Sequence, residues 1–88
     1  MKYKVIFTER VVKQLKKLDK HISALIISWI NKNLEGCEEP RLYGKALVGN
    51  MQGKLRYSIG DYRLICQIND DTIKILILDV GHRKDIYD

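Results

Sequence analysis

This chain has few residues of the types that form disulfides, bind metals or break helices: two cysteines, two histidines and a single proline among 88 residues. Cys37 and Cys66 are too far apart for a CxxC redox or metal motif, so we interpret both as reduced thiols. Two histidines without an acidic pair at metal-binding spacing offer no ligand set. A chain of this length also has no room for a separate cofactor domain. We therefore predict neither a metal nor a cofactor.

Long apolar runs are also lacking, because none approaches the roughly 18 to 20 residues that cross a bilayer. The first residues, 1–5, lead directly into patterned sequence without a cleavable signal, which predicts a cytoplasmic protein with no membrane partner. Acidic residues number 11 against 16 lysines and arginines. The resulting formal charge of +5 favours an acidic partner. Hydrophobic residues at 45% and charged residues at 31% are typical of a folded domain, and we predict one domain over residues 1–88.

Apolar periodicity predicts six regular elements. The strands are 2–7, 52–59, 62–69 and 72–80, and the helices are 9–18 and 22–34. Thr8 is placed to cap the first helix, and the pairs Gly60-Asp61 and Asp70-Asp71 separate the last three strands. Residues 41–50 contain two glycines and are expected to form an irregular connector. This order predicts an α+β fold, in which an N-terminal strand and a three-strand C-terminal meander form a mainly antiparallel sheet and an antiparallel helical hairpin packs on one face.

Positive charge gathers on one side of the hairpin formed by residues 52–69. A two-residue turn at Gly60-Asp61 pairs Ser58 with Arg63, and the period of two then sorts the side chains onto two faces. One face is apolar: Leu55, Tyr57, Ile59, Tyr62, Leu64 and Cys66. The other carries Lys54, Arg56 and Arg63 with no carboxylate of the hairpin between them. Like charges so placed repel, so either an anion binds across them or carboxylates from elsewhere in the chain pair with them.

The segment after the last strand supplies His82, Arg83 and Tyr87 within a few residues. A two-residue turn at Asp70-Asp71 would place Arg63 opposite Leu78, a few residues before Arg83. We therefore expect this segment to fold near the basic face of the hairpin. The lysines on the first helix are better interpreted as a solvated surface than as a nucleic-acid contact.

Several motifs occur together in an order that matches a known family. They are Lys45–Gly49, Gly53–Tyr57, Gly60–Ile65, Gly81–Arg83 and Ile86–Tyr87. At this spacing they resemble the RelE branch of the RelE/ParE toxin superfamily over essentially the whole chain. The resemblance implies a bacterial type II toxin that enters the ribosomal A site and cuts mRNA. It also implies a cognate antitoxin of RelB or DinJ type that holds the toxin inactive, with the ribosome and mRNA as the other partners.

The resemblance further implies which residues act. Four residues fall on positions that the family uses for cleavage: Lys54, Arg63, Arg83 and Tyr87. Three more are expected to contact the substrate: Arg56, which matches a basic position, Gln52, which lies where some members have another lysine, and His82, which precedes Arg83.

The chemistry of metal-free RNA cleavage fits these residue types. The 2′-OH of the RNA is the nucleophile, so the enzyme must orient it, stabilise the charge that develops on the phosphate and protonate the leaving oxygen. The planar guanidinium of Arg63 suits a phosphate and stays charged, and Arg83 would act with it. Lys54 can donate to the phosphate or help remove the 2′ proton, and Tyr87 can stack on a base. His82 is the only base by residue type, so we predict slow cleavage of free RNA and faster cleavage on the ribosome.

Two other functions are compatible with the same sequence. A ParE-like protein would poison DNA gyrase by binding it, which would not require Lys54, Arg63, Arg83 and Tyr87 to converge. A nucleic-acid-binding module without catalysis would need only the positive charge and the basic helix. The clustered cations and the aromatic residue favour the ribonuclease over the gyrase inhibitor, whereas the binding module is distinguished by salt-sensitive RNA binding without a cleaved product.

Overall fold

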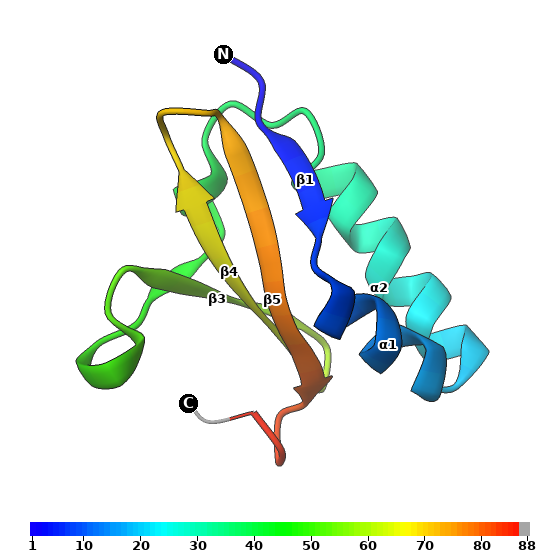
Figure 1. Ribbon diagram of the computed structural model, residues 1–88. Coiled ribbons are helices and arrows are strands. Elements are labelled where there is room, and N and C mark those ends of the chain that lie inside the picture. Colours follow the sequence, from blue (N-terminus) through cyan, green and yellow to red (C-terminus); the bar gives the residue numbers. More distant parts are fainter. Residues whose placement is uncertain (87–88) are drawn as a thin grey trace.

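The computed structural model describes residues 1–86 as a twisted sheet with two helices on one face (Figure 1). The strands are β1 (Lys4–Phe7), β2 (Lys45–Ala46), β3 (Lys54–Ile59), β4 (Tyr62–Asn69) and β5 (Lys74–His82). The helices are α1 (Glu9–Lys17) and α2 (Lys20–Asn33), with short 3₁₀ turns η1 (Pro40–Leu42) and η2 (Gly49–Met51) in the connector. The sheet order is β1-β5-β4-β3-β2, with β1 parallel to β5 and the other pairs antiparallel. The predicted α+β fold is confirmed.

Both helices begin at capping side chains. The hydroxyl of Thr8 accepts a hydrogen bond from the backbone N–H of Val11, and the carboxylate of Asp19 accepts one from that of His21. Because Asp19 is the cap, α2 starts at Lys20, two residues earlier than its apolar stripe indicates. Neither helix in the described part of the chain is long and apolar enough to cross a membrane.

The core lies between the helices and the apolar face of the sheet. Its buried members are Val5, Val11, Leu15, Ile26, Ile30, Leu34, Leu55, Tyr57, Ile59, Leu64, Cys66, Ile75, Ile77 and Val80. The apolar face predicted for the β3–β4 hairpin is therefore the core face, with Tyr62 packed at its margin. Burial of this face directs the cationic side of the hairpin away from the helices.

The register of β3 with β4 is as predicted, from Ile59 opposite Tyr62 to Lys54 opposite Gln67. The register expected for β4 with β5 was wrong, because Arg63 lies opposite Gly81 and not Leu78. The loop between these strands spans residues 70–73 rather than two residues, which moves the pairing by two. A bulge between Ile65 and Cys66 moves it by one more.

The connector contains a strand that the sequence pattern did not reveal. Lys45 and Ala46 form β2, which pairs with Arg56 and Leu55 of β3. Two residues are too few to show alternation, so periodicity could not identify this strand. Its effect is to place Lys45 opposite Arg56, on the side of the sheet away from the helices.

Burial of Cys66 has a consequence for stability at alkaline pH. Removal from water raises the pKa of its thiol from 9.0 to about 12, and burial also raises the pKa of Tyr57. Between these thiol pKa values the unfolded chain has lost a proton that the native chain keeps, so stability falls as pH rises through this window. We expect the Cys66 thiol to lower the free energy of unfolding by about 2 kcal/mol between pH 7.5 and pH 10.5.

Urea unfolding at both pH values measures this loss. Cys66→Ala serves as the control, because other groups titrate equally in both proteins. A difference between the two proteins that does not change with pH would show that the thiol is not protected in the folded state.

Candidate functional site

Four basic residues lie in a row on the face of the sheet away from the helices. Lys54, Arg56 and Arg63 share this face through the β3–β4 register, and Lys45 extends the row onto β2. Lys54 and Arg56 are two residues apart, which is about 6.6 Å along the strand, and Arg56 and Arg63 are diagonal neighbours about 7–8 Å apart. Lys45 was not among the predicted site residues, because nothing in the pattern of residues 41–50 indicated a strand.

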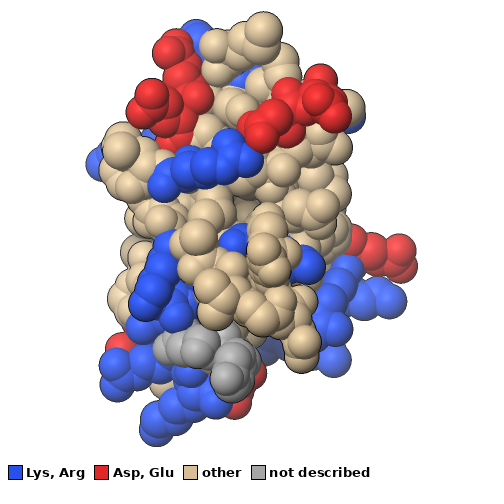
Figure 2. All heavy atoms as spheres, turned by 90° about the vertical axis from the view of Figure 1, so that its left-hand side faces the viewer, with Lys and Arg blue, Asp and Glu red and all other residues tan. Residues whose placement is uncertain are grey.

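Charge is unevenly distributed over this side of the molecule. Figure 2 shows basic side chains gathered in its lower half, whereas most of the visible carboxylates lie near its upper edge. Lys54 and Arg63 form no ion pair with any carboxylate of residues 1–86. The sequence left open whether an anion binds across the basic face or whether carboxylates from elsewhere in the chain neutralise it. For Lys54 and Arg63, no carboxylate of residues 1–86 does so.

Arg63 is held by the turn that joins β3 to β4. Its Nη1 donates hydrogen bonds to the carbonyl oxygens of Gly60, at 2.9 Å, and Tyr62, at 3.0 Å. The turn is possible because Gly60 adopts a φ of 58°. The Nε of Arg63 is buried and has no hydrogen-bond partner among the described residues. This guanidinium is therefore fixed in position while one of its donors remains unused.

Arg83 is attached to the same turn from the end of β5. Its backbone N–H donates to the carbonyl oxygen of Asp61 at 2.7 Å, and its Nη1 lies 3.8 Å from a carboxylate oxygen of Asp61. Both side chains of this ion pair are more than half exposed, at 56% and 65%. Arg63 and Arg83 are thus both bonded to the turn of residues 60–62.

The segment after β5 folds back over Gly81, the residue opposite Arg63. The backbone N–H groups of Asp85 and Ile86 both donate to the carbonyl oxygen of His82 and close a tight turn. Ile86 is buried, and a Cβ atom at position 81 would lie 3.2 Å from its Cγ1. Any larger residue at position 81 would therefore require the Ile86 side chain to shift. Tyr87, the predicted aromatic member of the site, lies outside the described residues.

His82 lies on the other face of β5 from Gly81. It pairs with Tyr62 and makes an edge-to-face ring contact at 5.4 Å, and its Nδ1 accepts a hydrogen bond from the backbone N–H of Lys84. Arg63 is on the opposite face of the sheet. His82 therefore has a structural contact at the end of the sheet, and its predicted substrate contact stays a prediction.

Lys54 and Gln52 lie at the far end of the row from Arg83. Lys54 begins β3, four residues from Ser58, which is the partner of Arg63; this separation is about 13 Å along the strand. Gln52 is exposed, and its backbone N–H closes η2 on the carbonyl oxygen of Gly49. The basic residues therefore form an extended row that ends in the Arg63 and Arg83 pair.

A groove lies beside this row, between residues 45–51 and Arg56, with a volume of about 910 Å³. Lys45 and Arg56 contribute charge to it, and Leu47, Val48 and Met51 contribute apolar surface. No group of three or more His, Cys, Asp or Glu within residues 1–86 is arranged to hold a metal ion. A row of cations beside a partly apolar groove suits a single-stranded polyanion whose bases need a surface to contact.

Comparisons with known proteins show the family to which this chain belongs. The family model described as "ParE toxin of type II toxin-antitoxin system, parDE" matches residues 5–87. Toxin RelG of Mycobacterium tuberculosis is 36% identical over 87 residues, which cover 99% of this chain and 98% of that protein. The chain belongs to the RelE/ParE superfamily of type II toxins.

Solved structures show the same fold for this RelE/ParE-type toxin. The crystal structure of a RelBE toxin–antitoxin complex from M. tuberculosis contains a chain that matches with a TM-score of 0.85 and 32% identity, covering 94% of this chain and all of that one. The isolated RelE toxin of Escherichia coli matches with a TM-score of 0.72 and 26% identity, covering 91% of this chain and 83% of that one. The resemblance to RelE toxins seen in the sequence motifs is confirmed.

Proposed function

We propose that this toxin is a ribosome-dependent endoribonuclease that cleaves mRNA in the A site and so inhibits translation in the cytoplasm. The observation that carries the proposal is the attachment of Arg63 and Arg83 to one turn, at the end of a row of cations on one face. Such a row can hold the backbone of a single strand while its end acts on one phosphate.

The two arginines stabilise the transition state. Attack of a ribose 2′-OH on the adjacent phosphate forms a 2′,3′-cyclic phosphate and breaks the bond to the 5′ oxygen, which leaves with a proton. The negative charge that develops on the phosphoryl oxygens during this step is balanced by the two arginines. Because two carbonyl oxygens already orient Arg63, its free donors need little reorganisation when that charge develops. Arg83 is exposed beside the same turn and can approach the phosphate from the other side. Arg56 and Lys54 contact the neighbouring phosphates.

Deprotonation of the 2′-OH is the step that the toxin's own residues catalyse least. His82 faces away from Arg63, so no histidine is placed to act as a base at the arginine pair. Lys54 lies at the far end of the row, so the predicted Tyr87 remains the group that can orient the 2′-OH. The ribosome would raise the rate by holding the mRNA in a conformation in which the 2′-OH is aligned with its phosphate.

This proposal requires cleavage to depend on the ribosome. We expect the purified toxin to cut mRNA bound in a ribosomal A site about 100-fold or more faster than the same RNA free in solution, because alignment of the attacking group is supplied by the ribosome. Single-turnover cleavage with both substrates at one salt concentration measures the ratio. Equal rates on the two substrates would contradict the proposed mechanism.

The inhibitor of the toxin is proposed to be a cognate antitoxin of RelB or DinJ type. The chain carries a formal charge of +5, so an acidic segment that folds on the toxin surface would neutralise it while binding.

Inhibition of DNA gyrase is the second candidate, because the matching family model carries the ParE description. A gyrase inhibitor would act by protein contact and would not need the arginine pair at the turn. A supercoiling assay with purified gyrase distinguishes the two functions: inhibition there, together with intact mRNA on ribosomes, would replace the ribonuclease proposal.

A further inference from the structure

Strand β5 contains one residue more than β4 at the bulge between them. Ile77 pairs with Cys66 and Asp79 pairs with Ile65, so Leu78 has no partner on β4. A bulge of this kind bends a strand and changes the direction of the side chains that follow it. Without the extra residue the register before the bulge would continue, and Arg63 would lie opposite Val80. The bulge therefore keeps Val80 in the core and places Gly81 beside Arg63.

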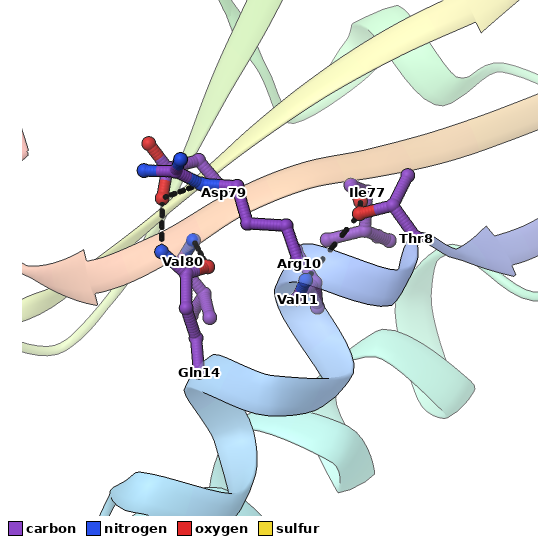
Figure 3. Close-up of polar contacts among 7 residues, drawn as sticks. All are labelled: Thr8, Arg10, Val11, Gln14, Ile77, Asp79 and Val80. Atoms are coloured by element: carbon purple, nitrogen blue, oxygen red, sulfur yellow. Dashed lines mark hydrogen bonds and ion pairs between the residues drawn. The ribbon is translucent and has the colours of Figure 1, made fainter.

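Helix α1 holds β5 on both sides of this bulge (Figure 3). Before it, the hydroxyl of Thr8 donates to the carbonyl oxygen of Ile77 at 2.6 Å. After it, the Nε2 of Gln14 donates to the carboxylate of Asp79 at 2.6 Å, and the backbone N–H of Val80 donates to the Oε1 of Gln14 at 2.9 Å. A single carboxamide thus fastens the two residues that follow Leu78.

Gln14 does more here than solvate the helix. The buried side chains of α1 are the apolar Val11 and Leu15, whereas Gln14 is a partly buried polar residue. At the bulge the backbone N–H of Val80 needs a hydrogen-bond acceptor, and the side chain of Gln14 on α1 supplies it. Arg10 adds charge from the same helix, with its Nε 3.6 Å from the carboxylate of Asp79.

We propose that Gln14 and Asp79 are positioning residues for Arg83. This role rests on the proposed ribonuclease function. These two residues hold the bulge, the bulge sets where Gly81 lies, and only two residues separate Val80 from Arg83. The close contact of Ile86 with Gly81 and the bond from the Arg83 N–H to the Asp61 carbonyl both depend on this register. Gln14 therefore acts from the opposite side of the sheet on the place where Arg83 meets the substrate.

Gln14→Leu tests the proposal, because it keeps a side chain of similar size and removes both hydrogen bonds. Amide hydrogen exchange is measured at Val80 and Arg83, and cleavage of ribosome-bound mRNA is measured as kcat and KM. We expect exchange at both amides to accelerate about tenfold or more, and kcat to fall about tenfold with KM within about twofold. Asp79→Asn, made in the wild-type background, keeps an oxygen acceptor for Gln14 and is expected to leave both readouts near the wild-type values.

Ile30→Val is the control for a general loss of stability, because it trims a buried core residue of α2 and leaves the hydrogen bonds at the bulge in place. It should raise exchange broadly and leave kcat unchanged. If Gln14→Leu accelerates exchange at Val80 but not at Arg83, or leaves kcat unchanged, the positioning role is wrong. If the wild-type toxin does not cut mRNA at all, the ribonuclease proposal fails, whereas the exchange at Arg83 still decides whether Gln14 fixes its position.

Discussion

Replacement of Arg83 by alanine is expected to lower the rate of mRNA cleavage on ribosomes by about 100-fold to 1,000-fold, the usual cost of losing one preorganised donor at a developing charge. The fold should be unaffected. The backbone bond from residue 83 to Asp61 survives the substitution, and the lost ion pair is long, at 3.8 Å, and exposed. Exposed pairs of this kind contribute about 1 kcal/mol or less. Cleavage rates and thermal unfolding of the same preparations measure the two effects.

Lys84→Ala is the matched control for Arg83→Ala, because it removes a neighbouring exposed cation that has no side-chain ion pair within residues 1–86. It should keep the wild-type cleavage rate at moderate salt. Antitoxin binding should survive both substitutions. Undiminished cleavage by Arg83→Ala would remove Arg83 from the site. An equal loss of cleavage in Lys84→Ala would show that net charge is the cause of the effect.

Replacement of Tyr57 by alanine is expected to lower the free energy of unfolding by about 3–5 kcal/mol, the range for removing a large aromatic side chain from a core. Tyr57 is completely buried, its ring lies 5.7 Å from that of Trp29 on α2, and its hydroxyl donates to the carbonyl oxygen of Pro40. It also packs against the backbone of the connector, where a Cβ at position 44 would lie 3.0 Å from its Cε1. Chemical denaturation measures the change.

Two further variants separate the causes of this loss. Tyr57→Phe keeps the ring and leaves the Pro40 carbonyl without its donor, so about 1–3 kcal/mol is expected. Tyr43→Ala removes an exposed tyrosine of the same connector and should change stability by about 0.5 kcal/mol or less. A loss for Tyr57→Ala no larger than that for Tyr43→Ala would show that the connector is not fixed to the core through Tyr57.

The parts of the fold that could be predicted from the sequence are those set by local chemistry. Thr8 predicts the start of α1, because it is a capping residue. The alternation of apolar and polar side chains, together with the Gly60-Asp61 turn, predicts the two faces of the β3–β4 hairpin and the register of its strands. The register of β4 with β5 depends on features that the periodicity of the sequence does not reveal. One is the loop of residues 70–73, in which Ile73 adopts a left-handed conformation with a φ of 57°, and the other is the bulge at Leu78. The bulge depends on Gln14, which is more than 60 residues away in the sequence.

The same distinction applies to the candidate site. The cations of β3 and β4 could be placed on one face from the sequence, because one turn fixes their register. The meeting of Arg63 and Arg83 at one turn required the corrected pairing with β5, and Lys45 required a strand of two residues. His82 was assigned by its neighbour in the sequence, although adjacent residues of a strand point to opposite faces. Tyr87 stays a prediction.

The most direct test of the central claim is a primer-extension map of cellular mRNA after the toxin is induced, compared for wild type, Arg63→Ala and Arg83→Ala. If the arginine pair acts on ribosome-bound message, wild type should produce cuts inside translated codons, and both variants should lose them. Intact mRNA in cells that stop growing, or the same cuts in all three strains, would contradict the claim that this pair cleaves mRNA.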